Sequence, residues 1–397
     1  MVPDVFGRHP HAFWLRPAED TRDALAARAL VLDAGGARLA WVALDLVAVD
    51  RALTRAVERR LAAAGLRAAT LILSASHTHS GPGAFVDSAL LAWLAMDRLD
   101  AAVRDAIVDA AVTAIRHADA ARVPARVGAS TVAAPAVTVS RLDRPLDREI
   151  RVLRVAAAGG APIALVWNHA IHGTMLSARN LRLSGDVMGV ASRALERALG
   201  VPALFVNGAV GDVSPRHHGE SAMREVGAAL AGAAREGWDR ATPGAADGLR
   251  VARRRVTLPA PRLSLAGCLR GWSPRGLTLP LGAALPRDAE LVAASVGNVA
   301  WVTVPGELQT ALGAELRRGA ARRFAPVLIA GTSNDYLGYF VTPEDYARPG
   351  YVTCASVYGP GAGACLVETA GRLLAEVGGP DAWRPPAGGP SACAAAR

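Results

Sequence analysis

The sequence predicts an α/β fold in which mixed β-sheets are flanked by helices. The main observation is a set of five apolar runs, each ending in a polar loop that contains glycine. The runs are TLILSASHTHSG at 70–81, IALVWNHAIHG at 163–173, ALFVNGAVGD at 203–212, VAWVTVPGE at 299–307 and PVLIAGTSNDY at 326–336. Strands that are apolar along their whole length are usually covered on both faces. The helices predicted elsewhere in the chain would supply that cover.

The helices are predicted from apolar residues that recur every three or four positions. In the segment 99–118, the side chains of Val103, Ile107, Ala111 and Ile115 fall on one face. The segments 189–200 and 307–323 show a similar pattern. Without repeats or an internal linker, the pattern predicts one domain over residues 1–378, followed by a loose tail over 379–397.

Composition narrows the class of protein. Hydrophobic residues make up 51% of the 397 residues, which is typical of a globular chain. No apolar run reaches the roughly 18 residues that a transmembrane helix needs. Residues 1–17 lack the basic start and apolar stretch of a signal peptide, so we expect a cytoplasmic protein. The four cysteines show no metal-ligand spacing, and in a reducing compartment we expect free thiols at Cys268, Cys354, Cys365 and Cys393.

The distribution of charged residues along the chain does not favour nucleic-acid binding. The formal charge is +9, and all 44 basic residues are arginine. These arginines are scattered along the chain, apart from short clusters such as 253–255. Nucleic-acid binding requires a concentrated basic face. We therefore expect no nucleic-acid partner.

The loops after the five predicted strands carry the residues with chemical potential. In layered α/β proteins, ligands bind beyond the carboxyl ends of such strands. The first four loops carry His77 and His79, His169 and His172, Asp212 and Ser214, and Glu307. All five tyrosines follow the fifth strand, at Tyr336, Tyr339, Tyr346, Tyr351 and Tyr358. Histidine, carboxylate and phenolate groups suit zinc, and a nearby hydroxyl can act as a nucleophile.

Each of these signals also has a structural interpretation. A single histidine at a strand end is more often a hydrogen-bonded polar group than a ligand, and we favour that interpretation for His169. Asp212 and Ser214 are equally compatible with a helix cap. Asp45 is either a carboxylate that orients a metal ligand or a buried, hydrogen-bonded aspartate. The joint occurrence of such residues at five strand ends favours a metal site.

Six stretches, in order along the chain, resemble the neutral/alkaline, non-lysosomal ceramidase family and its N-terminal catalytic domain. They are HTHSGPG at 77–83, AIHGTM at 170–175, SGDVMG at 184–189, NGAVGDVSP at 207–215, VPGE at 304–307 and NDYLGYFVTPEDYARPGYVTCASVYGP at 334–360. The resemblance implies a zinc amidase that cleaves the N-acyl bond of ceramide. It also implies that residues 1–378 form the catalytic domain.

The resemblance also implies roles for single residues. The zinc ligands would be His77, His172, Glu307 and Tyr339. Ser214 matches the family's essential serine, and His79 would carry protons. Arg141 matches an arginine beside the site, and Tyr351 matches a tyrosine that stabilises the oxyanion. A metal would polarise the substrate carbonyl or lower the pKa of a water.

Several departures bear on the substrate. The stretch SRLDRP at 140–145 stands where the family usually has NRSP. From the length of the sequence, we expect no counterpart of the immunoglobulin-like domain that larger members carry. Together with the expected compartment, and a pocket lined by tyrosines and Trp301, this favours shorter or more soluble N-acyl compounds over long-chain ceramide. The partner would be a small N-acyl substrate, and peripheral membrane contact is compatible with the sequence. The alternatives are a zinc-dependent esterase, an acyltransferase of a biosynthetic pathway, or a silent metal- or ligand-binding protein.

Overall fold

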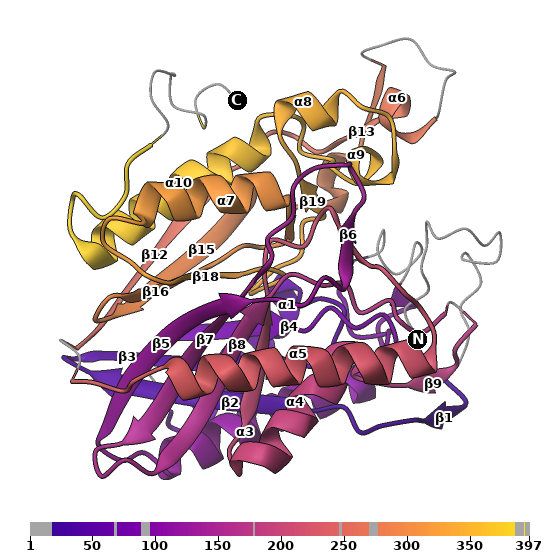
Figure 1. Ribbon diagram of the computed structural model, residues 1–397. Helices are drawn as coiled ribbons and strands as arrows, with labels where there is room; N and C mark the ends of the chain where they lie inside the picture. The colour runs from indigo at the N-terminus through magenta and orange to yellow at the C-terminus, as the bar shows by residue number, and fades with distance from the viewer. Residues whose placement is uncertain are drawn as a thin grey trace.

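The computed structural model describes most of the chain (Figure 1). The described residues are 18–66, 70–88, 96–177, 179–245, 248–269, 277–385 and 393. The first 17 residues, in which no signal peptide was recognised, lie outside them. No helix in the described part of the chain is both long and apolar enough to cross a bilayer.

The first of three large sheets has the strand order β2-β3-β4. Its strands are β2 (Ala27–Ala34), β3 (Ala37–Leu44) and β4 (Thr70–Ala75), and its helices are α1 (Arg51–Ala63) and α3 (Ala101–Ala120). The pair β2–β3 is antiparallel and the pair β3–β4 is parallel, so the sheet is mixed. Helix α1 buries Leu53 and Val57, and α3 buries Val108, all in one core with the sheet.

The second sheet has the order β10-β8-β7-β5. Its strands are β5 (Ala125–Ala133), β7 (Glu149–Ala157), β8 (Pro162–His169) and β10 (Ala203–Asn207). The helices α4 (Asp186–Leu199) and α5 (Glu220–Arg240) lie along one face, as both views show. The pair β8–β10 is parallel, so the ends of both strands point the same way.

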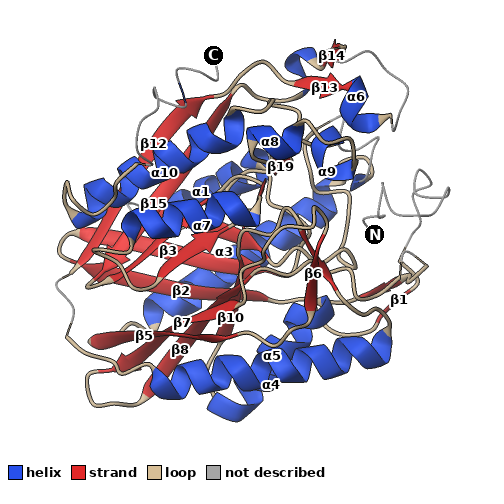
Figure 2. Ribbon diagram, turned by 45° about the horizontal axis from the view of Figure 1, so that its top comes forward, coloured by secondary structure: helices blue, strands red, loops and turns tan. Residues whose placement is uncertain are grey.

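The third sheet has the order β12-β15-β16-β18. Its strands are β12 (Leu249–Thr257), β15 (Asp288–Val296), β16 (Val299–Thr303) and β18 (Val327–Ala330). The helices α7 (Thr310–Ala320) and α10 (Ala362–Gly378) cover it (Figure 2). All five predicted strands are therefore confirmed, as β4, β8, β10, β16 and β18.

The three sheets share one apolar interior. Trp41 of β3 stacks on Trp301 of β16 at a centroid distance of 5.3 Å, and Val166 of β8 belongs to the same cluster. Trp301 is fully buried, so the expectation that it lines a substrate pocket is wrong. Successive side chains of β16 point to opposite faces of the sheet, and that of Trp301 points into the core.

Short elements connect the sheets. They are β1 (Asp20–Thr21), β9 (Arg182–Leu183), β6 (Thr138–Ser140), β11 (Val213–Pro215), β17 (Glu307–Leu308) and β19 (Tyr339–Phe340). Further elements are β13 (Arg262–Ser264), β14 (Thr278–Pro280), α6 (Leu265–Cys268), η2 (Gly282–Ala284), α8 (Pro343–Tyr346) and α9 (Tyr351–Cys354). The helix expected from residue 307 begins instead at Thr310, because 307 and 308 form the parallel ladder β17–β19.

The expectation of free thiols is wrong. Cys268 is bonded to Cys354, and Cys365 is bonded to Cys393. Sequence spacing did not reveal these pairs, because the first joins two short helices 86 residues apart in the chain. The start of the tail is also packed, since Ala382 and Trp383 lie in the core around α10. Residues 386–392 and 394–397 of the tail lie outside the described residues.

Candidate active site

The ring of His77 directs Nε2 toward the site, while its Nδ1 is hydrogen-bonded to the backbone. His77 directly follows β4 and has a φ of 70°, a conformation that non-glycine residues adopt rarely. Its Nδ1 lies 2.6 Å from the carbonyl oxygen of Val47, and its backbone N–H donates to Leu46. Since the carbonyl can only accept, Nδ1 carries the proton and Nε2 keeps its lone pair. This is the tautomer in which a histidine binds a metal through Nε2.

The loop of His172 is joined to the loop of His77 through Gly173. The N–H of His79 donates to the carbonyl of Gly173 at 2.9 Å, and the N–H of Gly173 donates to the carbonyl of His77 at 3.2 Å. A Cβ atom on Gly173 would lie 2.6 Å from that carbonyl oxygen. Glycine is therefore required for the two histidine loops to lie this close.

Asn207, at the end of β10, forms hydrogen bonds with the backbone of both loops. Its amide nitrogen donates to the carbonyls of Ser76 at 3.1 Å and Ile171 at 2.9 Å. Its amide oxygen accepts from the N–H groups of Ile171 and Gly208. One fully buried side chain thus fixes the backbone just before each proposed ligand, His77 and His172.

Glu307 lies between the two histidines. Its Oε1 is 3.4 Å from Nε2 of His77, and its Oε2 is 3.0 Å from Nε2 of His172. The rings of His77 and His172 are 4.5 Å apart by their centroids. His79 is also close, because one ring nitrogen from each of the three histidines lies within 4.8 Å of the other two.

These groups fit a metal ion. Nε2 of His77, both ring nitrogens of His79 and His172, and Oε2 of Glu307 form no hydrogen bond among the described residues. The nearest polar neighbours of Nε2 in His77 and His172 are the carboxylate oxygens of Glu307, at 3.4 and 3.0 Å. Leaving so many buried polar atoms unpaired is costly, and an ion bound between them would satisfy several at once. Imidazole and carboxylate groups are ligands that suit zinc among the divalent metals.

The ionisation of these groups agrees with metal binding. Burial lowers the pKa of His172 to about 3 and lowers that of His79 well below its usual value, so both rings are neutral near neutral pH. Burial opposes ionisation of Glu307, but the neighbouring His77 and His172 outweigh it and hold the pKa of that carboxyl well below its usual range. Neutral imidazole and ionised carboxylate are the forms that coordinate metals.

A second group of side chains adjoins the histidines. Ser214 lies on β11, which pairs with β6. Arg141 is the residue that directly follows β6 in the chain. The Nε of Arg141 donates to Oγ of Ser214 at 2.7 Å, and its Nη1 donates to the hydroxyl of Tyr339 at 3.2 Å. The hydroxyls of Tyr339 and Tyr351 are 3.1 Å apart. Serine, arginine and two phenols thus form one continuous hydrogen-bonded chain.

The two groups meet through the β17–β19 ladder. Its register places Glu307 directly opposite Tyr339. The carboxylate near the histidines and the phenol near Ser214 therefore come from paired residues. Arg141 is also close enough for its positive charge to lower the pKa of His172, and for the carboxylate of Glu307 to raise the pKa of Arg141. The structure brings together all eight residues predicted from the sequence.

Comparison with known proteins identifies the family. The model of the neutral/alkaline non-lysosomal ceramidase N-terminal domain matches residues 18–229, which is more than half of the chain. The chain belongs to this family. It is a ceramidase-type hydrolase, and the resemblance noted in the sequence is confirmed.

Individual relatives agree with this assignment. A neutral ceramidase of Mycobacterium tuberculosis is 26% identical over 446 aligned residues, covering 85% of this chain and 69% of the relative. Neutral ceramidase B of Dictyostelium discoideum is 30% identical over 120 residues, or 28% of this chain and 17% of the relative.

Solved structures share the fold. The crystal structure of neutral ceramidase from Pseudomonas aeruginosa superposes with a TM-score of 0.76 at 22% identity, covering 91% of this chain and 69% of that one. A ceramidase complexed with C2 gives the same TM-score and identity, over 89% and 70% of the two chains. The predicted α/β class with mixed sheets is confirmed.

For Asp212, Asp45 and His169, the sequence allowed both a functional and a structural interpretation. In this ceramidase-family chain, the contacts of all three side chains are structural. Asp212 does not cap a helix at GDVSP, because residues 213–215 form the strand β11; its Oδ1 instead accepts from N–H and Oγ1 of Thr310, the first residue of the distant helix α7. Asp45 accepts from Arg28 and from the N–H of Ala26, which makes it a buried hydrogen-bonded aspartate. His169 contacts the carbonyl of Glu149 through Nδ1 and is not part of the histidine cluster.

Sequence reasoning missed Tyr336. Its hydroxyl donates to Oε1 of Glu307 at 2.6 Å, so it belongs to the site alongside Tyr339 and Tyr351. Its place among the five clustered tyrosines was the available signal. The other two tyrosines serve elsewhere: Tyr346 packs beside Val352, and Tyr358 donates to the carbonyl of Pro286 in the core.

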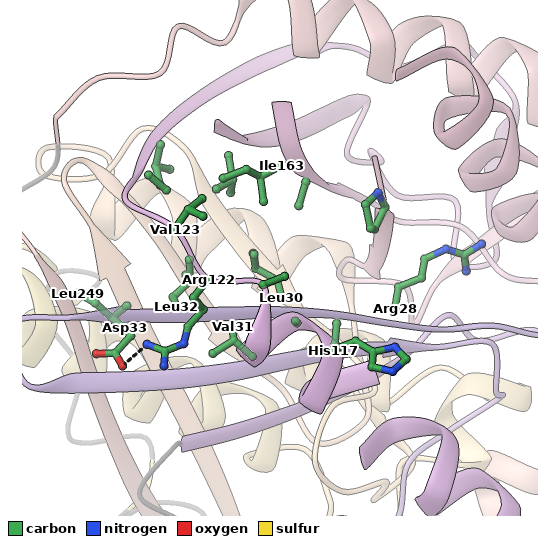
Figure 3. Close-up of a pocket in the computed structure, with 18 of the residues that line it drawn as sticks. Arg28, Leu30, Val31, Leu32, Asp33, His117, Arg122, Val123, Ile163 and Leu249 are labelled. Atoms are coloured by element: carbon green, nitrogen blue, oxygen red, sulfur yellow. Dashed lines mark hydrogen bonds and ion pairs between the residues drawn. The ribbon is translucent and has the colours of Figure 1, made fainter. Parts of the chain in front are cut away.

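A cavity of about 840 Å³ lies apart from this site (Figure 3). Its walls include Leu30 and Leu32 of β2, His117 of α3 and Ile163 of β8. No residue of the histidine cluster or of the Ser214 group lines it. Its charged lining residues Arg28 and Arg122 are already paired with carboxylates. The cavity is therefore not the reaction site.

Proposed function

We propose that this chain is a zinc-dependent amidohydrolase that cleaves the N-acyl amide bond of a ceramide-like lipid or a related N-acylated metabolite. The observation that carries the proposal is the contact of Glu307 with both His77 and His172, beside the Arg141–Ser214 hydrogen bond. A metal centre adjacent to a polarised hydroxyl is the arrangement that acyl-transfer chemistry needs.

The proposed ligands are His77, His172, Glu307 and Tyr339. When bound, zinc would supply positive charge that polarises the scissile carbonyl. The hydroxyl of Tyr339 is already held by Arg141 and Tyr351, and burial raises its pKa well above the usual value. A nearby cation would favour its ionised form.

Ser214 would act as the nucleophile or would position an attacking water. The Arg141 guanidinium donates to Oγ, which favours the deprotonated state of this hydroxyl. His79 is half-buried and neutral, and its two buried ring nitrogens form no hydrogen bond among the described residues. It would accept the proton from the attacking group and pass it to the leaving amine. Tyr351 would donate a hydrogen bond to the oxyanion.

The experiment that tests this function is a matched substrate panel. N-acyl amides of graded acyl length are compared with the corresponding esters and with transfer to an added acceptor amine. Cleavage of amides with the highest kcat/KM supports the proposal. Preferential ester cleavage would identify an esterase, and product formation only with the acceptor would identify an acyltransferase. Binding without turnover of any compound would identify a silent binding protein.

The compartment is also a proposal. No signal peptide was recognised in the sequence, which favoured the cytoplasm, but two disulfides favour an oxidising compartment because they rarely persist in the cytosol. We propose the oxidising compartment. Alkylation of thiols in freshly lysed cells measures it directly. Unlabelled cysteines are expected, whereas four labelled cysteines would return the protein to the cytoplasm.

A further inference from the structure

Exposed apolar side chains gather on one projecting part of the molecule. Five large apolar side chains are exposed among the residues that the structure describes. Three of them, Leu269, Leu277 and Leu279, are each 49% exposed and lie within 11 residues of sequence. They belong to the leucine lobe (residues 258–269 and 277–287), which comprises β13, α6, β14 and η2. Figure 2 shows β13, β14 and α6 at an outer end of the molecule, near α8 and α9.

The charge of this stretch is one-sided. Residues 258–287 contain four arginines and no aspartate or glutamate. Among those described, Arg262 and Arg287 are exposed. Elsewhere on the surface, arginines are commonly paired with carboxylates, as Arg224 is with Glu220. Neither Arg262 nor Arg287 forms a salt bridge within the part of the chain that the structure describes. Exposed leucines beside such arginines suit the interface of a bilayer that carries anionic lipids.

The leucine lobe is firmly attached to the part of the fold that carries the site. Cys268 of α6 is bonded to Cys354 of α9, the short helix that begins with Tyr351. The N–H of Gly350 donates to the carbonyl of Gly267 at 3.0 Å, and the N–H of Arg262 donates to the carbonyl of Val357 at 2.8 Å. The exposed leucines are therefore presented by a fixed platform.

Packed side chains connect the lobe to the site. The side chain of Tyr346 lies close to that of Ser264, the cap of α6. Tyr346 also packs in the cluster that contains Tyr339, Val352 and Tyr351. Two of these tyrosines belong to the candidate site. Packing thus couples the lobe to two side chains of the candidate site.

We propose that the leucine lobe is a docking surface for an anionic lipid bilayer. Leu269, Leu277 and Leu279 would enter the interface while Arg262 and Arg287 contact headgroup phosphates. The delivery of substrate from this surface rests on the proposed amidohydrolase function, whereas the docking itself does not. Such a surface favours a substrate presented in a bilayer, contrary to the preference for soluble amides expected from the sequence.

Co-sedimentation with vesicles tests the docking without any measurement of activity. The vesicles contain phosphatidylcholine and phosphatidylglycerol in equal parts, or phosphatidylcholine alone. We expect the wild-type protein to bind the mixed vesicles, and the Leu277→Glu/Leu279→Glu double variant to bind at least about tenfold more weakly. Binding should weaken as salt is raised, because the headgroup attraction is screened.

Val123→Glu is the matched control. Val123 is 53% exposed and lies beyond the end of α3, outside the leucine lobe. This variant should bind mixed vesicles as the wild type does. Near-wild-type turnover of a short-chain soluble amide by the double variant would show that its fold and site are intact. Loss of turnover on vesicle-borne amide alone would then separate docking from catalysis.

Three results would overturn the proposal. One is absence of wild-type binding to either vesicle. Another is equal binding by the double variant and the Val123→Glu control. The third is a wild-type dimer that the double variant loses while vesicle binding stays unchanged, because the leucines would then cover a second copy of the chain. If no amide is cleaved but docking behaves as expected, the proposed function fails and the surface stands.

Discussion

The hydroxyl of Tyr336 donates a hydrogen bond to Oε1 of Glu307 at 2.6 Å, while Oε2 of the same carboxylate lies 3.0 Å from His172. Oε1 is thus held by Tyr336 and also lies 3.4 Å from His77, while Oε2 contacts His172. This arrangement fixes the orientation of a proposed metal ligand. Partners of this kind are important for metal affinity even though they do not touch the ion.

Tyr336→Phe is therefore expected to weaken zinc binding by about 10- to 100-fold. The reason is that Glu307 loses the group that holds its side chain in the binding orientation. Competition with a chromophoric chelator measures the affinity. Tyr358→Phe is the control, because the hydroxyl of Tyr358 donates to the carbonyl of Pro286 away from the site. Equal zinc affinities for the two variants would show that Tyr336 does not position Glu307.

Ser214→Ala is expected to lower kcat by at least about 100- to 1,000-fold while leaving fold and metal content unchanged. Both mechanisms, direct attack by Ser214 and attack by a water that Ser214 positions, require its hydroxyl beside Arg141. Ser221→Ala, on the exposed start of α5, is the control. Trapping of an acyl-serine by mass spectrometry would favour direct attack, and near-normal turnover by Ser214→Ala would rule out both mechanisms.

Gly173→Ala is expected to separate the two histidine loops. The added methyl group would lie 2.6 Å from the carbonyl oxygen of His77 and 2.6 Å from the side chain of Met188. Relief of such contacts typically costs about 1–3 kcal/mol of unfolding free energy, and zinc affinity should fall with it. Gly159→Ala is the matched control, since no atom lies within 4 Å of its added carbon. Urea unfolding of both variants measures the effect, and equal midpoints would contradict it.

Asp186 makes the stability depend on pH. Burial raises the pKa of this carboxyl to about 6, against an unfolded value of 3.8. The folded protein therefore binds the proton more tightly, and Asp186 costs stability as pH rises from about 4 to above 6. Relative to Asp186→Asn, the wild type should lose up to about 3 kcal/mol over this range. Asparagine also tolerates the φ of 53° found there.

Urea unfolding of both proteins at a series of pH values tests this expectation. The difference in unfolding free energy between Asp186→Asn and the wild type should grow in favour of the variant as pH rises. A difference that is independent of pH would mean that Asp186 ionises normally in the folded protein.

Local sequence was sufficient for the strands and for the residues that follow them. Apolar runs predicted β4, β8, β10, β16 and β18, because burial on both faces leaves a clear pattern. The resemblance to a known family supplied residues that periodicity could not, such as Arg141 on an irregular loop. The structure places that loop against Ser214 through the short β6–β11 pair.

What the sequence could not predict depends on contacts between distant segments. The bond between Cys268 and Cys354 needs two short helices to meet, and neither has a periodic signal. Burial of Trp301 against Trp41 depends on how two sheets face each other. The role of Tyr336 depends on which of the clustered tyrosines points at Glu307. Each requires the tertiary arrangement, which local propensity does not encode.

The central claim is that His77 and His172, with Glu307, hold a zinc ion. Elemental analysis of protein purified without added metal measures this most directly, with circular dichroism as the check on folding. We expect one zinc per chain in the wild type and its loss in a folded His77→Ala/His172→Ala variant. A wild-type protein without zinc, or full retention of zinc by the folded double variant, would contradict it.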